Sequence, residues 1–342
     1  MPDDYENFLP EVEDAARREE VRPFLHDEML TCDACLRANP PTRLNCLYCG
    51  ARLPVSEQSA ALRRPSLRQP EKWEEGYNVI LNKRPRATDE LLKETVSLLR
   101  LEREEAKRIL EAAEPLPLAR VHSPEEARII EERLGSCGLS LIVVPDSELM
   151  MKDENRKRTR AFDFAGDAVT AYAAGGNETW RAEWSEMVLL VTGRLVVRRI
   201  EFEERRKSGG SEMVEARELM GDVLLLDLYT KARDGGWRVA SDSFDFSCLK
   251  ERKGLVAAQN FEVLIEVLRE RAPQMMVDDS YNRSRHALAS VWPPEERTES
   301  KGLRRERPGR FNVEAVMTSD NEAQFTRYSR LRHFLKLLEA QL

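Results

Sequence analysis

Four of the chain's six cysteines form two C-x2-C pairs, Cys32 with Cys35 and Cys46 with Cys49, separated by ten residues. Two such pairs can supply four thiolates to one tetrahedral Zn²⁺ ion, because the two-residue spacing lets both thiolates of a pair point at the same ion. The pattern predicts a four-cysteine zinc finger at residues 30–52 with one structural Zn²⁺. Four thiolates would fill the coordination sphere of zinc, which leaves no open position for activating water.

The spacing within the finger is C-x2-C-x3-N-x6-C-x2-C, with Asn39 as the asparagine. It resembles the zinc finger of the Ran-binding-protein type, although Leu30 stands where that family usually carries a tryptophan. Some members of the family bind single-stranded RNA and others bind ubiquitin, so the resemblance implies zinc and leaves the ligand open. If the ligand is RNA, we expect Arg37, Arg43 and Asn45 to contact it.

The charge of the chain is unevenly distributed. The net charge of -7 is carried by residues 1–29, an acidic N-terminal tail with ten acidic residues and three arginines. The balanced remainder argues against a globally basic nucleic-acid-binding protein. Residues 36–70 are nevertheless locally basic, with six arginines and one glutamate, and such a strip can contact phosphates. A solvated linker at 53–75 is the more frequent explanation for a charge run of this kind.

The bulk composition excludes a membrane protein. Charged residues make up 34% of the chain and the mean hydropathy is -0.55, and no apolar run approaches the ~20 residues that a spanning helix needs. The N-terminus is acidic, unlike a secretory signal peptide. We therefore expect a cytoplasmic protein, in which cysteines stay reduced and bind metal instead of forming disulfides.

Residues 76–150 predict a small domain with the element order β-α-α-β-α-β. Strands are expected at 77–81, 116–121 and 139–144. Thr88 can cap the first helix, and a second helix with apolar residues at helical spacing follows it. Ser123 and Pro124 open the third helix, with serine at the cap and proline at the first helical position.

This domain resembles the C-terminal domain of the bacterial ribosomal stalk protein and its structural relative, the Clp protease adaptor. Residues 77–81 fit the opening F-x-V-x-L strand of the stalk family, residues 91–93 its V-I-K helix entry, and residues 104–111 its K-E-A-K-x-L-V-E helix. Both families hold protein partners with this fold, so the resemblance implies a docking role in a bacterial protein. It identifies neither partner, because the glycine-rich turn of the stalk is missing and residues 82–84 read Asn-Lys-Arg in place of the adaptor's Asn-Asp-Asp.

The first two helices of this domain should turn their apolar residues towards the sheet, because a small sheet needs one covered face. Four basic residues are then left on or near the open side as a docking surface for an acidic partner: Lys93, Arg100, Arg103 and Lys107. The acidic tail at residues 1–29 is one candidate for that partner. In that case it acts as a self-inhibiting lid.

Residues 155–274 change to a period of two residues, which predicts strands. Turns are expected at 166–167, 192–194 and 234–236, and a charged loop is expected around Gly209 and Gly210. A helix capped by Asn260 closes the segment. Six or seven short strands with one closing helix resemble the bacterial form of the pleckstrin-homology-like barrel or sandwich, a likeness of architecture that does not fix a function.

The last segment, residues 275–342, is expected to be an extension that ends in an amphipathic helix opened by a capping box, Ser319-x-x-Glu322. The apolar stripe of this helix comprises Phe325, Tyr328, Leu331, Phe334, Leu335 and Leu338. Such a stripe is usually core. The alternative is a helix that dimerises or docks in the groove of a partner, so the oligomeric state stays open.

The sequence contains no catalytic constellation. Its four histidines are scattered, and neither a phosphate-cradling G-x-x-x-x-G-K-[ST] loop nor a G-x-S-x-G elbow occurs. The α+β multidomain plan therefore favours a non-catalytic, zinc-binding adaptor that mediates protein–protein interactions. Two alternatives remain. One is an RNA- or ribosome-associated factor that binds single-stranded RNA through the finger and the arginine-rich linker, and the other is an enzyme whose site the sequence does not reveal.

Overall fold

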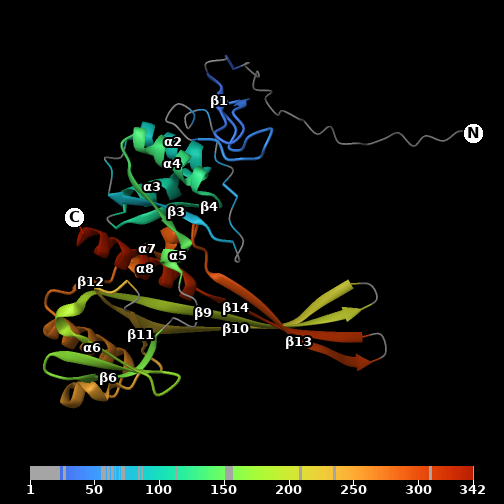
Figure 1. Ribbon diagram of the computed structural model, residues 1–342. Coiled ribbons are helices and arrows are strands. Elements are labelled where there is room, and N and C mark those ends of the chain that lie inside the picture. Colours follow the sequence, from blue (N-terminus) through green and yellow to red (C-terminus); the bar gives the residue numbers. More distant parts are fainter. Residues whose placement is uncertain are drawn as a thin grey trace, which may run out of the picture. The chain divides into compact units, whose positions relative to one another are not determined.

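The computed structural model (Figure 1) divides into two compact units, Met1–Arg63 and Arg64–Leu342. The described residues are 24–25, 28–54, 59, 62, 65, 67–68, 70, 74–83, 85, 88–112, 114–150, 157–207, 210–233, 236–307 and 310–341, with side chains described outside 202–216 and 300–314. Within these ranges no helix is long and apolar enough to cross a membrane. The first unit contains the cysteine-rich segment, and the second contains every longer helix and strand of the described chain.

The second unit begins with a three-stranded antiparallel sheet whose order is β4-β3-β5. Its elements are β3 (Tyr77–Lys83), α2 (Asp89–Leu99), α3 (Arg103–Glu111), β4 (Leu116–Val121), α4 (Pro124–Ser136) and β5 (Ser140–Pro145), followed by the short helix α5 (Asp146–Leu149). The predicted order β-α-α-β-α-β is confirmed. We refer to this part as the α/β domain.

The helices of the α/β domain begin where the capping residues predict. The Oγ1 of Thr88 accepts a hydrogen bond from the N–H of Leu91 at 3.2 Å, and the Oγ of Ser123 accepts one from the N–H of Glu126 at 3.2 Å. Each bond satisfies a backbone donor that has no partner within its helix. Local sequence therefore sets both helix starts.

A nine-stranded mixed sheet forms the rest of the second unit and curls into a half-barrel. Its order is β13-β14-β9-β10-β11-β6-β7-β8, with β12 pairing with β9. The strands are β6 (Arg158–Phe164), β7 (Ala168–Ala173), β8 (Thr179–Glu183), β9 (Met187–Lys207), β10 (Gly210–Thr230), β11 (Gly236–Ala240), β12 (Met276–Asp278), β13 (Glu295–Arg307) and β14 (Arg310–Asp320). The protein is thus a mixed α+β structure, as expected.

Helical segments pack on this sheet and divide its core in two. They are the 3-10 helices η3 (Trp184–Glu186) and η4 (Phe246–Arg252) and the helices α6 (Ala257–Arg271), α7 (Tyr281–Leu288) and α8 (Glu322–Glu339). One core joins α6 and η4 to the sheet. The other core contains residues of α7, α8, the sheet and the whole α/β domain.

The turn expected at 192–194 is wrong, because β9 runs through it without a break. Gly193 is buried in the middle of the strand, where a Cβ atom would lie 2.5 Å from the ring of Phe325 and 2.9 Å from that of Tyr281. The glycine is therefore required for close packing of α7 and α8 on the strand, not for a turn.

We expect Gly193→Ala to lower the free energy of unfolding by about 1–3 kcal/mol, because the added methyl group overpacks a filled core. The matched control is Gly221→Ala on the neighbouring strand β10, where a Cβ would meet nothing within 4 Å. Urea denaturation of both variants measures the difference. Equal stabilities for the two variants would show that the rings can move aside at no cost.

The charged loop expected around Gly209 and Gly210 is also wrong, since paired strand extends to Lys207 on β9 and restarts at Gly210 on β10. Residues 208–209 lie outside the described residues. Charges of opposite sign face each other across the two strands, as between Arg198 and Glu218 at 2.7 Å, which stabilises such a pair. The second edge of β9 is covered by β14.

The segment after residue 274 therefore contributes to the sheet instead of merely extending the chain. β12 pairs in parallel with β9 along residues 276–278, and the β13–β14 hairpin lies beside β9. The contacts that produce this arrangement join residues far apart in the sequence. The alternation of apolar and polar residues within one strand does not indicate which distant strand it pairs with.

Two of the predicted helix starts are displaced. Helix α8 begins at Glu322, so the capping box at Ser319 is wrong: Ser319 belongs to β14, and the Oδ1 of Asp320 accepts from the N–H of Glu322 at 3.0 Å. Helix α6 begins at Ala257, so Asn260 is not its cap. The Asn260 side chain lies within the helix and bonds both the N–H and the carbonyl of Gly254, at 2.6 and 3.0 Å.

The α/β domain and the large sheet share one core. The indole N–H of Trp292, which is fully buried, donates to the Oδ1 of Asn78 in β3 at 2.8 Å. Phe325, Tyr328 and Leu331 of α8 are also fully buried. The first half of the apolar stripe of α8 is therefore core, whereas its last residue, Leu338, is exposed.

Candidate metal centre

The first unit carries its cysteines on two similar turns. The N–H of Leu36 donates to the carbonyl of Cys32 at 2.7 Å in the first turn, and the N–H of Gly50 donates to the carbonyl of Cys46 at 3.1 Å in the second. Leu36 and Gly50 have φ values of 58° and 73°, a left-handed conformation that glycine adopts readily and leucine does not. Each turn closes tightly after its second cysteine.

The two turns bring four sulphur atoms together. The Sγ atoms of Cys32 and Cys49 lie 3.6 Å apart and those of Cys35 and Cys46 lie 3.5 Å apart, and all four are within 4.8 Å of one another. Four Zn–S bonds of ~2.3 Å in a tetrahedron place the sulphurs about 3.8 Å apart. The predicted cluster is confirmed: these four cysteines can hold one metal ion. A tetrahedral set of four sulphurs suits zinc or iron.

Asn39 joins the two turns, a role that the spacing pattern alone did not reveal. It ends the small sheet of β1 (Leu30–Thr31) and β2 (Ala38–Asn39), and its side chain is fully buried. Its Oδ1 accepts from the N–H of Leu47 at 2.8 Å. Its Nδ2 donates to the Arg37 carbonyl at 2.8 Å and to the Sγ of Cys46 at 3.4 Å. Asn39 therefore orients a metal-binding sulphur from outside the cluster.

We expect Asn39→Ala to weaken zinc binding by about 10–100-fold, the usual cost of removing a group that orients a metal ligand. Asn45→Ala is the matched control, because Asn45 lies in the same finger and its side chain is exposed. Competition with a chromophoric chelator gives both affinities. If the two variants bind zinc equally, the amide of Asn39 is not needed for orientation.

Hydrogen bonds prepare one thiol of the cluster for ionisation. Burial by itself raises the pKa of Cys46, but the N–H groups of Cys49 and Tyr48 and the amide of Asn39 bond its sulphur and bring the pKa down to about 6. The opposite happens at Cys35: hydrogen bonds from the backbone of Arg37 lower its pKa, while burial and the three neighbouring thiols raise it above the usual range. A bound cation would favour the deprotonated form of both Cys46 and Cys35, because thiolates rather than thiols are metal ligands.

Apolar residues on the two turns are exposed. Leu36 is 77%, Leu47 52% and Tyr48 56% exposed, and we call these three the knuckle patch. The guanidinium of Arg37 lies 4.7 Å from the centre of the Tyr48 ring, which links the first turn to the second. The two turns thus leave three large apolar side chains in contact with solvent.

The residues expected to contact RNA are in the same unit. Arg37, Arg43 and Asn45 are all exposed. The backbone of Asn45 forms an antiparallel bridge with that of Arg52, which follows the second cysteine pair in the sequence and is also exposed. Arg37 is engaged with Tyr48, as described above, and the other two side chains are directed to solvent.

The four basic residues proposed for docking on the α/β domain are also exposed: Lys93, Arg100, Arg103 and Lys107. The opposite faces of α2 and α3 are buried as expected, at Leu91, Leu92, Ile109 and Leu110. Arg103 is paired with Asp89 at 2.8 Å. The acidic tail, residues 1–29, lies mostly outside the described residues, so its role as a lid stays a prediction.

Two carboxylates and a histidine of the second unit make contacts with neighbouring side chains or backbone. Asp278 is buried and accepts from the hydroxyl of Tyr328 at 3.2 Å, and Asp245 accepts from the N–H of Ser247 at 2.9 Å. His122, on the surface, lies 3.9 Å from Glu74.

Comparisons of the chain with protein-family models, with curated proteins and with solved structures found no match.

Proposed function

We propose that this protein is a non-catalytic, cytoplasmic, zinc-binding adaptor that holds other proteins. The knuckle patch carries the proposal, since two cysteine turns present apolar side chains to solvent on a frame that the metal would make rigid. Four thiolates close the set, as in structural zinc sites, and the spacing of the cysteines, which is that of a zinc finger, favours zinc over iron. The resemblance to the Ran-binding-protein type of finger supports the same assignment.

The second unit would supply further binding surfaces. Likeness of the α/β domain to the stalk and Clp-adaptor families, and of the half-barrel to the pleckstrin-homology-like architecture, supports a chain assembled from protein-binding modules. Lys93, Arg100, Arg103 and Lys107 would increase the rate of association with an acidic partner more than the final affinity. An activity beyond binding is not needed to account for any of these features.

An RNA-associated role is the alternative. Tyr48 is an exposed aromatic ring with Arg37 against it, and aromatic rings next to guanidinium groups are used to stack unpaired bases. Arg43 would add a phosphate contact. Binding of this kind weakens steeply as salt rises, because phosphate contacts release counterions.

Two variants of the full chain separate the alternatives. Leu47→Ser removes apolar surface from the knuckle patch without changing charge, whereas Arg43→Ser removes a phosphate contact and spares the patch. The adaptor role predicts that Leu47→Ser loses the proteins that wild type captures from lysate, that Arg43→Ser keeps them, and that single-stranded RNA binds weakly. Tight RNA binding with a steep salt dependence, lost in Arg43→Ser, would establish the alternative instead.

A further inference from the structure

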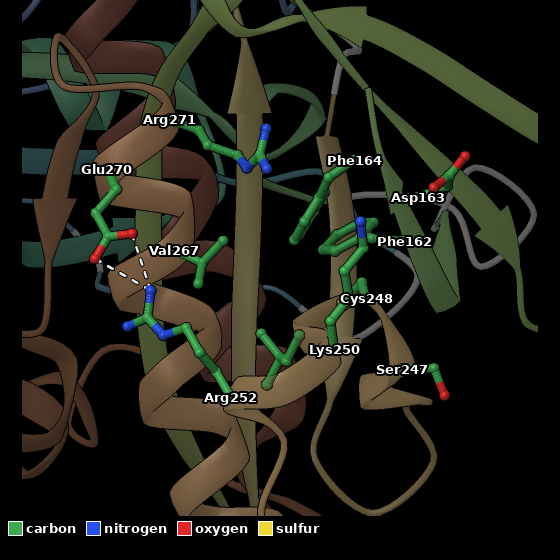
Figure 2. Close-up of a pocket in the computed structure, with 11 residues that line it drawn as sticks. Phe162, Asp163, Phe164, Ser247, Cys248, Lys250, Arg252, Val267, Glu270 and Arg271 are labelled. Carbon is green, nitrogen blue, oxygen red and sulfur yellow. Dashed lines mark hydrogen bonds and ion pairs between the residues drawn. The ribbon is translucent and has the colours of Figure 1, made fainter. Parts of the chain in front are cut away.

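A cavity of about 390 Å³ opens in the second unit between β6, η4 and α6 (Figure 2). Phe162 and Phe164 line it from β6, Leu249 from η4 and Val267 from α6. A cavity of this size lies at the low end of the range for ligand sites, about 300–1,000 Å³. We call it the β6–α6 groove. It is separate from the cysteine cluster, which belongs to the other unit.

One wall of the groove is an edge of the sheet that is only partly paired. β6 is paired with β7 from Thr159 to Phe164, with an irregularity at Arg160, but on its other side the parallel strand β11 reaches only Arg158 and Thr159. A single bridge to Asp245 follows at Ala161. Beyond it, no strand among the described residues pairs with this side of β6.

The β6–β7 hairpin shows which main-chain groups face the groove. The N–H of Ala165 bonds the carbonyl of Ala168, and bonded pairs alternate along an antiparallel ladder. Phe162 and Phe164 therefore direct their N–H and C=O groups away from β7. On that side the backbone of Phe162 is already engaged, by the parallel bridge of Ala161 with Asp245 and by the thiol of Cys248. No bond among the described residues includes the carbonyl of Phe162 or the N–H of Phe164, so these are the groups that an added strand would bond.

The opposite wall contains a strained residue. Lys250 has φ 52° and ψ -119°, a conformation that side-chain-bearing residues rarely adopt and that is found in ligand clamps. It interrupts the helical turns of η4 and lines the groove. Its side chain is exposed. The strain thus coincides with the opening between η4 and β6.

Some of the charged side chains around the groove already have a partner, an acidic side chain or an aromatic ring, and one does not among the described residues. Arg252 is paired with Glu266 and with Glu270, both at 2.9 Å, and Figure 2 shows the pair with Glu270. Arg271 lies over the rings of Phe164 and Trp184, at 5.2 and 5.5 Å from their centres. Among the described ion pairs none includes the ammonium group of Lys250, so an incoming carboxylate would find its partner there. Because Asp163 and Glu270 also line the groove, a polyanion such as RNA fits it poorly.

We propose that the β6–α6 groove binds an extended segment of a partner protein, which adds a strand to the open edge of β6. The segment places one large apolar side chain among Phe164, Leu249 and Val267. It also carries an acidic residue that pairs with Lys250. Main-chain bonds to β6 supply affinity, and the apolar and acidic side chains supply specificity, as in other cases of strand addition. The proposal stands whether or not the knuckle patch binds protein.

The probe is a phage library of random twelve-residue peptides, selected on the full-length protein. We expect the enriched peptides to share an apolar residue with a nearby carboxylate. Fluorescence anisotropy should show that Lys250→Glu weakens the best peptide at least tenfold. Lys231→Glu is the control, since it reverses another exposed lysine outside the groove and should leave the affinity unchanged. Both changes are on the surface, so folding is not at risk.

An N-methyl scan of the same peptide tests strand addition itself. Methylation at every second amide should abolish binding, and methylation at the amides between should not, because only alternate N–H groups of an edge strand face its neighbour. Four results would overturn the proposal: no enrichment of peptides, equal effects of the two lysine variants, a scan without alternation, or single-stranded RNA competing for the groove. Loss of binding in a Leu47→Ser variant would instead point to the finger.

Discussion

Cys32→Ser is expected to abolish stoichiometric metal binding and to unfold the first unit while the second unit stays folded. The Cys32 sulphur is fully buried, and the small core around it consists of Cys32, Cys46 and Leu53 with Cys35 and Ala51 packed against them. So few apolar residues cannot hold a fold without a cross-link. Structural zinc in finger peptides is worth roughly 10 kcal/mol, which is then lost.

Amide NMR spectra are the appropriate measurement for this variant. Resonances of residues 28–54 should collapse to random-coil positions. Those of the α/β domain and the half-barrel should stay where they are, because the two cores of the second unit contain no residue of the first unit's small core. Cys137→Ser is the matched control, since Cys137 is an exposed free cysteine. A folded first unit in Cys32→Ser, with dispersed resonances, would mean that metal is dispensable for the fold.

The second large effect is expected at a buried ion pair of the half-barrel. Arg238 in β11 donates from Nε and Nη2 to the two oxygens of Asp227 in β10, both at 2.7 Å, and each side chain is only 6% exposed. Arg238 also donates to Thr326 and Glu322 of α8 and lies 5.0 Å from the Phe325 ring centre. The pair thus fastens α8 to the sheet.

Asp227→Asn should lower the free energy of unfolding by about 3–5 kcal/mol, because it removes the bidentate carboxylate from a buried guanidinium. Only Glu322, at 3.2 Å, then balances the charge of Arg238. Glu218→Gln is the control: it breaks a cross-strand pair with Arg198 that is half exposed, and such pairs are worth at most ~1 kcal/mol. A double variant, Asp227→Leu with Arg238→Met, should recover most of the stability. Urea denaturation gives all three values, and similar losses in the two single variants would contradict the account.

Sequence predicted best those features that depend on neighbouring residues. The cysteine cluster follows from a spacing of two residues within each pair, and the helix starts at Thr88 and Ser123 follow from a side chain that bonds the backbone three residues on. The cysteine pairs and the helix starts each depend on residues no more than three positions apart. The apolar faces of α2 and α3 follow in the same way from helical periodicity.

Sequence predicted poorly those features that depend on residues distant along the chain. Residues 192–194 read Thr-Gly-Arg, which is typical of a turn. Only the approach of Phe325, more than a hundred residues later, explains why Gly193 lies within a strand. Ser319 has the spacing of a cap, but pairing of β14 with β9 keeps it in a strand. The β6–α6 groove and the Asp227–Arg238 pair likewise arise only when separate elements meet.

Extended X-ray absorption spectroscopy on the freshly purified, reduced protein tests the central claim most directly. The account predicts one zinc per chain by elemental analysis. It also predicts that the extended fine structure above the zinc edge is fitted by four sulphur ligands at about 2.3 Å, with no nitrogen or oxygen ligand. Preparations free of bound metal, an iron absorption edge in place of zinc, or a shell that needs nitrogen or oxygen ligands would each contradict a structural zinc held by Cys32, Cys35, Cys46 and Cys49.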